Sequence, residues 1–373
     1  MGFEFLSRHD LSGRGATMQL MSWGHHLYVG NMEPGVGTAI LDVADPRRPE
    51  LEGFLPGYRN TMSPKVQIAD DLLFVNYEWR KGEKAERTGF GIFDLSDPVE
   101  PRELAFYDTG GRGVHRMWYS GLEPTIFMSA VLPGFRDRMF LMVDVSDPTN
   151  PREIGRWWLP GQWEEGGETP AWRDDVSPKL HHGIVRGDRA YLGVWDAGLR
   201  ILDIADPGRP RVVGSAEWAP EHGGHTHTTM PLPERGLLVV TDEATATPDR
   251  ESPKLVRLFD IRDEANPVQL STLPEPQGPV RTHGPRFGPH NLHENRPGAF
   301  ASDQLVFVTY FSGGLRAYDI SDPHAPREVA AHVPPSTPDG GHPQTNDVYV
   351  EPDGLVFTTD RGGAGIEILQ YEV

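Results

Sequence analysis

The chain has 373 residues, of which 37% are hydrophobic, and no stretch approaches the roughly 18–20 apolar residues that a membrane helix needs. It contains no Cys, which excludes disulfides, thiolate catalysis and Cys-based metal sites. The net charge of −19 argues against nucleic acid or an anionic membrane as a partner, because both require a basic face. Residues 1–10 lack a basic segment followed by an apolar one, so we expect no secretory signal and a cytoplasmic location.

The first predicted element is a strand over about residues 2–8, followed by a turn at residues 11–13. It resembles residues 50–57, which read as the outer strand of a repeated unit, but no repeat motif precedes it. We therefore expect this segment to pair with a unit elsewhere in the chain.

From residue 41 onward one motif recurs, in which two Asp residues three positions apart lead into a Pro-containing turn. The copies lie at residues 41–46, 93–98, 143–148, 202–207, 259–263 and 318–323. Asp side chains accept backbone N–H groups two residues on, and Pro presets φ, so the motif predicts a tight turn between strands rather than catalytic carboxylates. The first Asp recurs at steps of 52, 50, 59, 57 and 59 residues, which suits a four-stranded propeller blade.

A seventh unit ends the chain, because residues 365–369 occupy the position of the motif strand. This unit lacks an outer strand, and the N-terminal strand can supply it, which would close the ring and remove an exposed sheet edge. The sequence therefore predicts an all-β fold, a seven-bladed β-propeller that forms one domain over residues 1–373, with its last blade closed by the N-terminal strand.

Alignment of the units on the motif places four histidines at the start of consecutive inner strands, in the third to sixth blades: His115, His182, His227 and His290. Inner strands line the central channel of a propeller, so these imidazoles should converge on the axis. Neutral imidazole binds Fe, Mn, Zn and Cu, and four ligands leave open positions. We predict a mononuclear divalent metal site, with Fe(II) favoured, Mn, Zn or Cu as alternatives, and His293 as the substitute for His290.

Further residues at the same edge are candidates for catalysis or substrate binding. His225 is two residues from His227 and should share its strand face. The candidate catalytic residues are His225, His293, Lys65 and Asp347. The candidate substrate-binding residues are Arg116, Arg361 and Gln344, with Arg112 as a further candidate for an anionic group. Glu243 and Glu294 could orient the ligands, and the Trp-rich insert at residues 157–172 is either a lid or packing.

The repeated segments at residues 202–207 and 318–323 resemble the LVIVD-repeat family of bacterial β-propellers. This resemblance covers nearly the whole chain and implies the propeller fold. The axial histidines are similar to those of carotenoid-cleavage oxygenases, in which four His hold iron, and of oligogalacturonate lyases, in which three His and a Gln hold manganese. Both likenesses are of architecture only.

These observations favour a metal-dependent enzyme that acts on a small organic substrate, with an aromatic compound as one option. The leading hypothesis is a non-haem iron oxygenase or oxidase. The first alternative is a metal-dependent lyase or hydrolase in which His225 or Lys65 moves a proton. The second alternative is a non-catalytic binding propeller.

Overall fold

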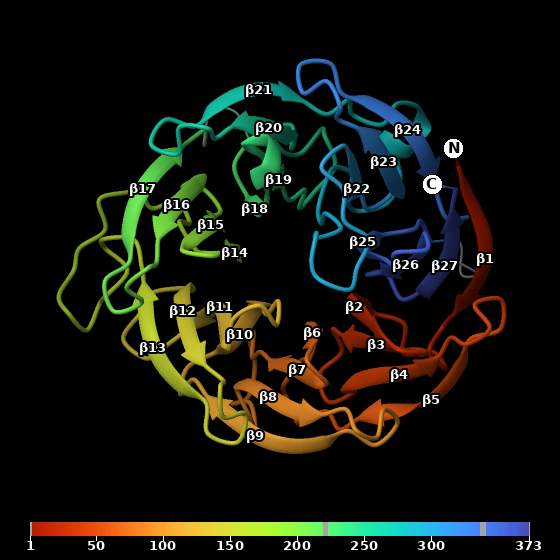
Figure 1. Cartoon of the computed structure of the whole chain (residues 1–373), viewed down its shortest axis with the longest axis horizontal. Helices are drawn as coiled ribbons and strands as arrows, with labels where there is room; N and C mark the ends of the chain where they lie inside the picture. Colours follow the sequence, from red (N-terminus) through yellow and green to blue (C-terminus); the bar gives the residue numbers. More distant parts are fainter. Residues whose placement is uncertain (1, 219–222, 336–340, 373) are drawn as a thin grey trace.

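The computed structural model describes residues 2–218, 223–335 and 341–372. Within them, seven antiparallel sheets surround a central axis in the order of the sequence, as Figure 1 shows. The predicted seven-bladed β-propeller is therefore confirmed. No helix of the described residues is long and apolar enough to cross a membrane.

Each of the first four blades contains four strands in chain order, with the first strand nearest the axis. The first two blades comprise β2 (Thr17–Trp23), β3 (His26–Asn31), β4 (Thr38–Asp42), β5 (Glu50–Leu55), β6 (Val66–Ala69), β7 (Leu72–Tyr77), β8 (Gly89–Asp94) and β9 (Arg102–Asp108). The next two comprise β10 (Gly113–Trp118), β11 (Thr125–Val131), β12 (Met139–Asp144), β13 (Arg152–Trp157), β14 (His182–Arg186), β15 (Arg189–Gly193), β16 (Leu199–Asp203) and β17 (Arg211–Ala216).

The fifth blade has the same order of four strands, and only the last two blades depart from it. The strands of these three blades are β18 (Thr226–Leu232), β19 (Leu237–Asp242), β20 (Val256–Asp260), β21 (Val268–Thr272), β22 (Leu305–Thr309), β23 (Leu315–Asp319), β24 (Arg327–His332), β25 (Thr345–Val350), β26 (Leu355–Asp360) and β27 (Gly365–Tyr371). Two short 3₁₀ helices, η1 (Pro233–Arg235) and η2 (Pro279–Thr282), lie in connections. In the sixth blade residues 290–293 take the place of the inner strand, where the N–H of His290 donates to the carbonyl of Thr309 (2.9 Å).

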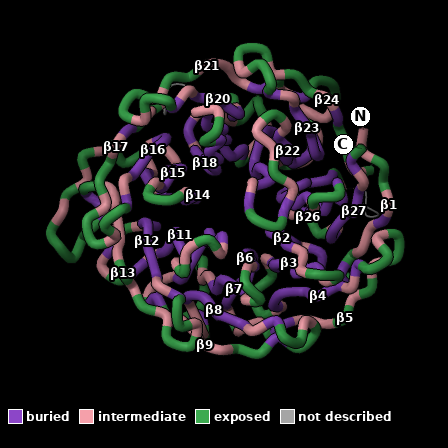
Figure 2. The backbone as a smooth tube through the Cα atoms, in the orientation of Figure 1, coloured by how far each residue is buried: buried purple, intermediate pink, exposed green. Residues whose placement is uncertain are grey.

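The motif that defines the repeat forms its turn as predicted. The first Asp of all six copies accepts the backbone N–H two residues later, at 2.7–3.0 Å. The second Asp does the same at 2.9–3.2 Å. These carboxylates lie at the periphery, where Figure 2 shows the exposed backbone, whereas the inner and middle strands are buried. The repeated Asp residues are therefore turn formers and not part of a site.

The N-terminal strand β1 (Phe3–His9) closes the ring. It pairs with β27 in an antiparallel register that joins Phe3 to Tyr371 and His9 to Ile366. The sheet order β1-β27-β26-β25 makes this segment the outer strand of the seventh blade, and Figure 1 shows the two ends of the chain side by side. The prediction of a blade divided between the two ends is confirmed.

Deletion of residues 1–9 should destabilise the protein by about 3 kcal/mol or more, because six paired positions are lost and backbone hydrogen bonds contribute about 0.5–1.5 kcal/mol each. The free edge of β27 should also promote self-association. Chemical denaturation and light scattering measure the two effects. Phe5→Ala, which shortens an exposed side chain of the same strand and leaves its backbone, is the control and should change little. An unchanged unfolding midpoint in the deletion variant would contradict the role of β1 in closure.

Candidate metal centre at the propeller axis

The register of the inner hairpins decides which residues reach the same level of the axis. In the second strand of each blade, one residue pairs with the motif Asp. The fourth residue after it is Ser129, Gly193, Thr241 or Thr309 in the third to sixth blades. Opposite these positions the inner strands place Arg116, His182, Thr228 and Asn291. The residues immediately before them are His115, His181, His227 and His290, which are therefore the equivalent histidines.

These four side chains, which we call the axial histidines, form a continuous group. The Nε2 atoms of His115 and His181 are 3.0 Å apart. The ring centroids of His181 and His227 are separated by 3.7 Å, and those of His227 and His290 by 4.4 Å. None of the four is more than 4% exposed. Three of the four predicted ligands therefore lie in the group, and His181 occupies the place where the alignment of the strand starts put His182.

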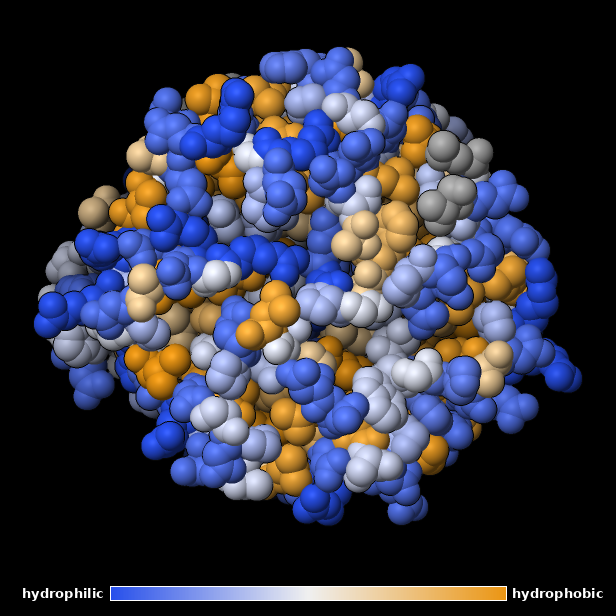
Figure 3. Space-filling model, in the orientation of Figure 1, coloured by the Kyte–Doolittle hydropathy of each residue, from blue (hydrophilic) through white to orange (hydrophobic). Residues whose placement is uncertain are grey.

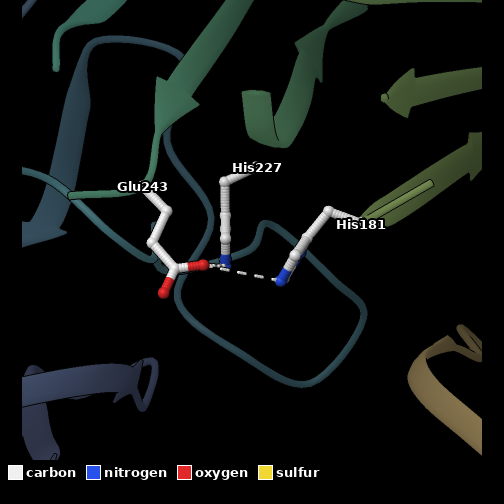
Figure 4. A group of neighbouring side chains, drawn as sticks. All are labelled: His181, His227 and Glu243. Atoms are coloured by element: carbon white, nitrogen blue, oxygen red, sulfur yellow. Dashed lines mark ion pairs between the residues drawn. The ribbon is translucent and has the colours of Figure 1, made fainter. Parts of the chain in front are cut away.

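Glu243 completes the arrangement from the loop after β19. Its Oε2 lies 3.8 Å from the Nε2 atoms of both His181 and His227, and its Oε1 lies 3.8 Å from Nε2 of His290. Figure 4 shows the carboxylate of Glu243 and the rings of His181 and His227 directed at one another. Burial alone would raise the pKa of this carboxyl group, but His290, Arg361 and Arg286 lower it to about 2, so it is ionised. The sequence assigned Glu243 an orienting role; the structure places it among the candidate ligands.

Oxygen atoms around the group orient the rings. Nδ1 of His115 lies 3.0 Å from both carboxylate oxygens of Glu78. Nδ1 of His290 donates to the carbonyl oxygen of Asn346 (2.6 Å), and Nδ1 of His227 lies 2.8 Å from the hydroxyl of Thr228. Metal-binding imidazoles generally engage their second nitrogen in this way. Three of the four rings thus have Nε2 available as a ligand.

Two ring nitrogens of the group have no hydrogen-bond partner among the described residues, Nδ1 of His181 and Nε2 of His227. Burial lowers the pKa of His115 and of His290 to about 3, and that of His181 and of His227 well below the usual value. The imidazoles are therefore neutral near pH 7, the state that binds metal. Ligand atoms about 2.0–2.2 Å from one ion lie roughly 3–4 Å apart. The separations of 3.0 and 3.8 Å fit that requirement.

Residues two positions after the one equivalent to Gly193 form a rim around this group. Glu78, Trp195, Glu243, Phe311 and Arg361 occupy that equivalent position in five blades. Trp195 stacks on His181 with 5.7 Å between centroids, and Phe311 lies 4.8 Å from His290. The sequence contained this signal, because each rim residue follows its strand at a constant offset, but it could be read only once the register was known.

His182 belongs to a separate cluster one level deeper, which we call the inner ion network. Its Nε2 lies 2.7 Å from Oε1 of Glu294, and the same carboxylate accepts hydrogen bonds from Arg116 (2.7 Å) and from Arg296. Arg116, predicted to bind substrate, is 1% exposed and is held by this pair. Glu294, predicted to orient a metal ligand, instead joins two buried guanidinium groups.

Lys65 and Asp347 occupy the same deeper level, because their backbone N–H groups donate to Asn76 and Thr359 at the positions equivalent to Ser129. Burial and the charge of Arg116 lower the pKa of Lys65 well below its usual range, and its Nζ has no hydrogen-bond partner among the described residues. Burial raises the pKa of Asp347 to about 6. The two predicted acid–base residues thus lie beside the axis, below the histidines.

The two spare histidines have different environments. His225 precedes β18 with a positive φ of 62°, so the alternation expected between it and His227 does not apply. Its ring stacks on Trp195 (4.4 Å) at the rim. Nε2 of His293 donates to the carbonyl of Phe300 (2.7 Å), and its Nδ1 accepts the N–H of Val350 (3.1 Å). Both ring nitrogens of His293 are thus engaged by backbone, so its predicted use as an alternative ligand is not supported.

The remaining predicted residues lie at the rim. Arg361 is 3.6 Å from Oε1 of Glu243, and Arg286 donates to the same oxygen (2.8 Å). The side chain of Gln344 donates to its neighbour Pro343 (2.8 Å) and does not contact the histidines. In the Trp-rich insert, Trp158 and Trp163 pack on Phe135 with centroids 5.3 and 6.4 Å away, which is the packing alternative. Hydrophilic residues gather around the middle of the face in Figure 3.

The sequence profile of the LVIVD repeat matches residues 134–157 and 184–217, within the third and fourth blades. The chain is a seven-bladed β-propeller that contains LVIVD repeats. The matched segments include the turn motifs at residues 143–148 and 202–207, and the second of these is one of the two segments that carry the resemblance. A comparison with curated protein sequences gives no match to this LVIVD-repeat propeller.

Solved structures resemble the LVIVD-repeat propeller in fold. A structural-genomics protein from Lactobacillus plantarum is 11% identical with a TM-score of 0.61, over 92% of this chain and 86% of the other. The β-propeller domain of Cps50 (Swd1) from Myceliophteria thermophila is 12% identical with a TM-score of 0.56, over 95% and 99%. The computationally designed Ika8 protein is 11% identical with a TM-score of 0.55, over 98% of each chain. At such identities the likeness concerns the fold alone.

Proposed function

We propose that this LVIVD-repeat propeller is a metal-dependent enzyme whose divalent ion is held on the axis by His115, His181, His227 and His290 together with Glu243. One observation carries the proposal. Buried, neutral imidazoles of His181, His227 and His290 direct Nε2 atoms at an ionised carboxylate. Oxygen atoms on the outer side engage Nδ1 of three of the four axial histidines. Without an ion, the buried Nε2 of His227 is an unsatisfied polar atom, which folded proteins generally avoid.

A divalent ion in this position would supply Lewis-acid activation of a substrate oxygen or, as iron, the activation of O₂. The chain's own residues have separable tasks. Glu78, Thr228 and the carbonyl of Asn346 fix the ring orientations, because each engages an Nδ1 atom. Trp195 and Phe311 cover the group with aromatic surface and limit the access of water. Arg286 and Arg361 keep Glu243 ionised.

The favoured chemistry is that of a non-haem iron oxygenase or oxidase. His181, His227 and Glu243 form a cluster in which every ligand atom lies within 4.8 Å of the others. Two histidines and one carboxylate are also the ligands of non-haem Fe(II) oxygenases, so this part of the five-residue site is compatible with iron. The expected all-imidazole site is thus replaced by a mixed one, and iron remains the favoured ion.

A second candidate is a metal-dependent hydrolase or lyase. Two histidines and a glutamate also hold catalytic zinc in hydrolases, so the same donor set accommodates this chemistry. His225 supports it, because the ring lies at the rim, 3.8 Å from Glu251 through Nδ1, where it could exchange a proton with a substrate. The identity of the bound metal and the requirement for O₂ separate the two candidates.

Metal analysis of protein purified without added metal tests the proposal. We expect one equivalent of a first-row divalent ion per chain, or its uptake on reconstitution of the chelated protein. Consumption of O₂ with iron bound supports the oxygenase, and O₂-independent turnover with zinc or manganese supports the second candidate. A chain that neither contains nor takes up any of these ions would overturn both and leave the non-catalytic binding propeller.

A further inference from the structure

A pocket of about 290 Å³ adjoins the axial histidines on the side of His115. Four cationic side chains line it, Arg80, Arg112, Arg138 and Lys179, and only two acidic ones, Glu78 and Asp137. This excess of positive charge occurs in a chain whose net charge is −19. Local charge of this sign beside the candidate metal points to an anionic ligand.

Both acidic groups of the pocket are already engaged. The two oxygens of Glu78 hold Nδ1 of His115 at 3.0 Å. Oδ1 of Asp137 accepts the backbone N–H of Arg138 (2.8 Å) and a hydrogen bond from Arg112 (3.3 Å). Its distance to Nε of Arg138 is 4.0 Å, which is beyond hydrogen-bonding range. Among the described residues, the side-chain hydrogen bonds of these two carboxylates go to His115 and Arg112, and none reaches the other cations.

Besides the exposed Arg80, two more deeply buried cations of the pocket lack an acceptor. In residues 2–218, 223–335 and 341–372, no hydrogen bond reaches the guanidinium of Arg138 or the ammonium of Lys179. Only 11% of the Arg138 side chain is exposed, and Lys179 lies over the ring of Trp195, with Nζ 5.0 Å from its centroid. Burial lowers the pKa of both groups. A buried guanidinium with unused donors is costly unless an anion is bound to it.

We propose that this pocket binds an oxyanion group of the substrate, a carboxylate or a phosphate, through Arg138 as a two-pronged donor and Lys179 as a point charge. His115 forms the shared wall, so an anion held there presents the rest of the molecule to the axial histidines. The substrate of the enzyme is thus a small organic anion. This assignment of substrate class rests on the proposed function, whereas binding of the anion itself requires no metal.

A larger neighbouring pocket provides space for the remainder of such a molecule. It has a volume of about 920 Å³ and shares Trp79, Arg112 and Val131 with the anion pocket. Leu132 and Phe135 add apolar surface to its lining. An organic anion with an apolar or aromatic body fits the two pockets better than inorganic phosphate alone.

Isothermal titration calorimetry of metal-free protein with benzoate, phenyl phosphate and uncharged benzamide tests the proposal. We expect at least one anion to bind and benzamide to bind at least tenfold more weakly. Arg138→Gln should weaken binding of the anion at least tenfold. Arg138→Lys keeps the charge but loses the two-pronged donor, so its affinity should lie between those of wild type and Arg138→Gln. The anion that binds more tightly identifies the source of the oxyanion. Arg152→Gln, an exposed arginine of the same blade, is the control and should bind as wild type.

Equal binding of benzamide and the anions, binding unaffected by Arg138→Gln, or no binding of either anion would each overturn the proposal. Metal content is measured on each protein before the metal is removed for calorimetry. Arg138→Gln should keep its metal, because Arg138 is not among the candidate ligands. Loss of anion binding with metal retained supports the anion pocket, whereas anion binding in a wild-type protein that takes up no metal would overturn the proposed function and leave the pocket standing.

Discussion

His181→Ala should reduce metal affinity by at least about a hundredfold, while His182→Ala should leave stoichiometric metal in place. Loss of a partner that only orients a ligand typically costs 10–100-fold, so loss of a ligand should cost at least as much. The two residues are adjacent in the sequence, equally buried, and differ in what their rings face. Nε2 of His181 is 3.0 Å from Nε2 of His115, whereas Nε2 of His182 is 2.7 Å from Glu294.

The measurement is metal content after gel filtration, followed by titration with Fe(II), Mn(II) and Zn(II) under anaerobic conditions. His227→Ala should match His181→Ala, because both rings lie 3.8 Å from the same oxygen of Glu243. Circular dichroism shows whether each variant keeps its fold. Retention of metal by His181→Ala together with its loss from His182→Ala would mean that the register-based assignment is wrong.

Glu294→Ala should lower the free energy of unfolding by about 3–5 kcal/mol, the usual cost of removing one partner from a buried ion network. The carboxylate of Glu294 is the shared acceptor of Arg116, Arg296 and His182. Its removal leaves two buried guanidinium groups without their counter-ion in the centre of the propeller. Most of the loss in stability therefore comes from the buried guanidinium groups that remain without an acceptor, and less from the contacts of the removed side chain.

Urea denaturation measures the change, with Glu4→Ala as the control. Glu4 forms an ion pair with Arg47 in which both side chains are more than half exposed, so its loss should cost less than about 1 kcal/mol. A Glu294→Ala protein as stable as the control would show that the network contributes nothing to folding.

The stability that Glu294 contributes should also depend on pH in a defined direction. Burial would raise the pKa of Glu294, but the charges of Arg116, His182 and Arg296 hold it well below its usual value. A carboxyl group with a depressed pKa in the folded state stabilises the protein above its unfolded pKa, about 4.3, and loses that contribution as the pH falls toward the folded value. The stability difference between wild type and Glu294→Gln should therefore be full near pH 7 and decrease in acid.

The sequence by itself determined the fold of this protein. Each motif turn involves only neighbouring residues, because Asp319, for example, accepts the N–H of Ser321 at 2.8 Å. Repetition of that turn at a blade-length spacing specified the propeller, and the unpaired first strand specified the closure of β1 on β27. Such local chemistry is readable from adjacent residues. The same reasoning brought His115, His227 and His290 to one level of the axis.

The tertiary structure decided the composition of the site, and the physical reason is register. The inner strands of the third and fifth blades carry an irregularity at His115 and at Thr226–Thr229, whereas β14 pairs with β15 without one. An extra residue in one strand shifts every side chain that precedes it, so His181 takes the place that the aligned strand starts gave to His182. Glu78 reaches His115 from another hairpin, and Glu243 likewise reaches His181 and His290. Only closure of the ring around its axis brings those hairpins together.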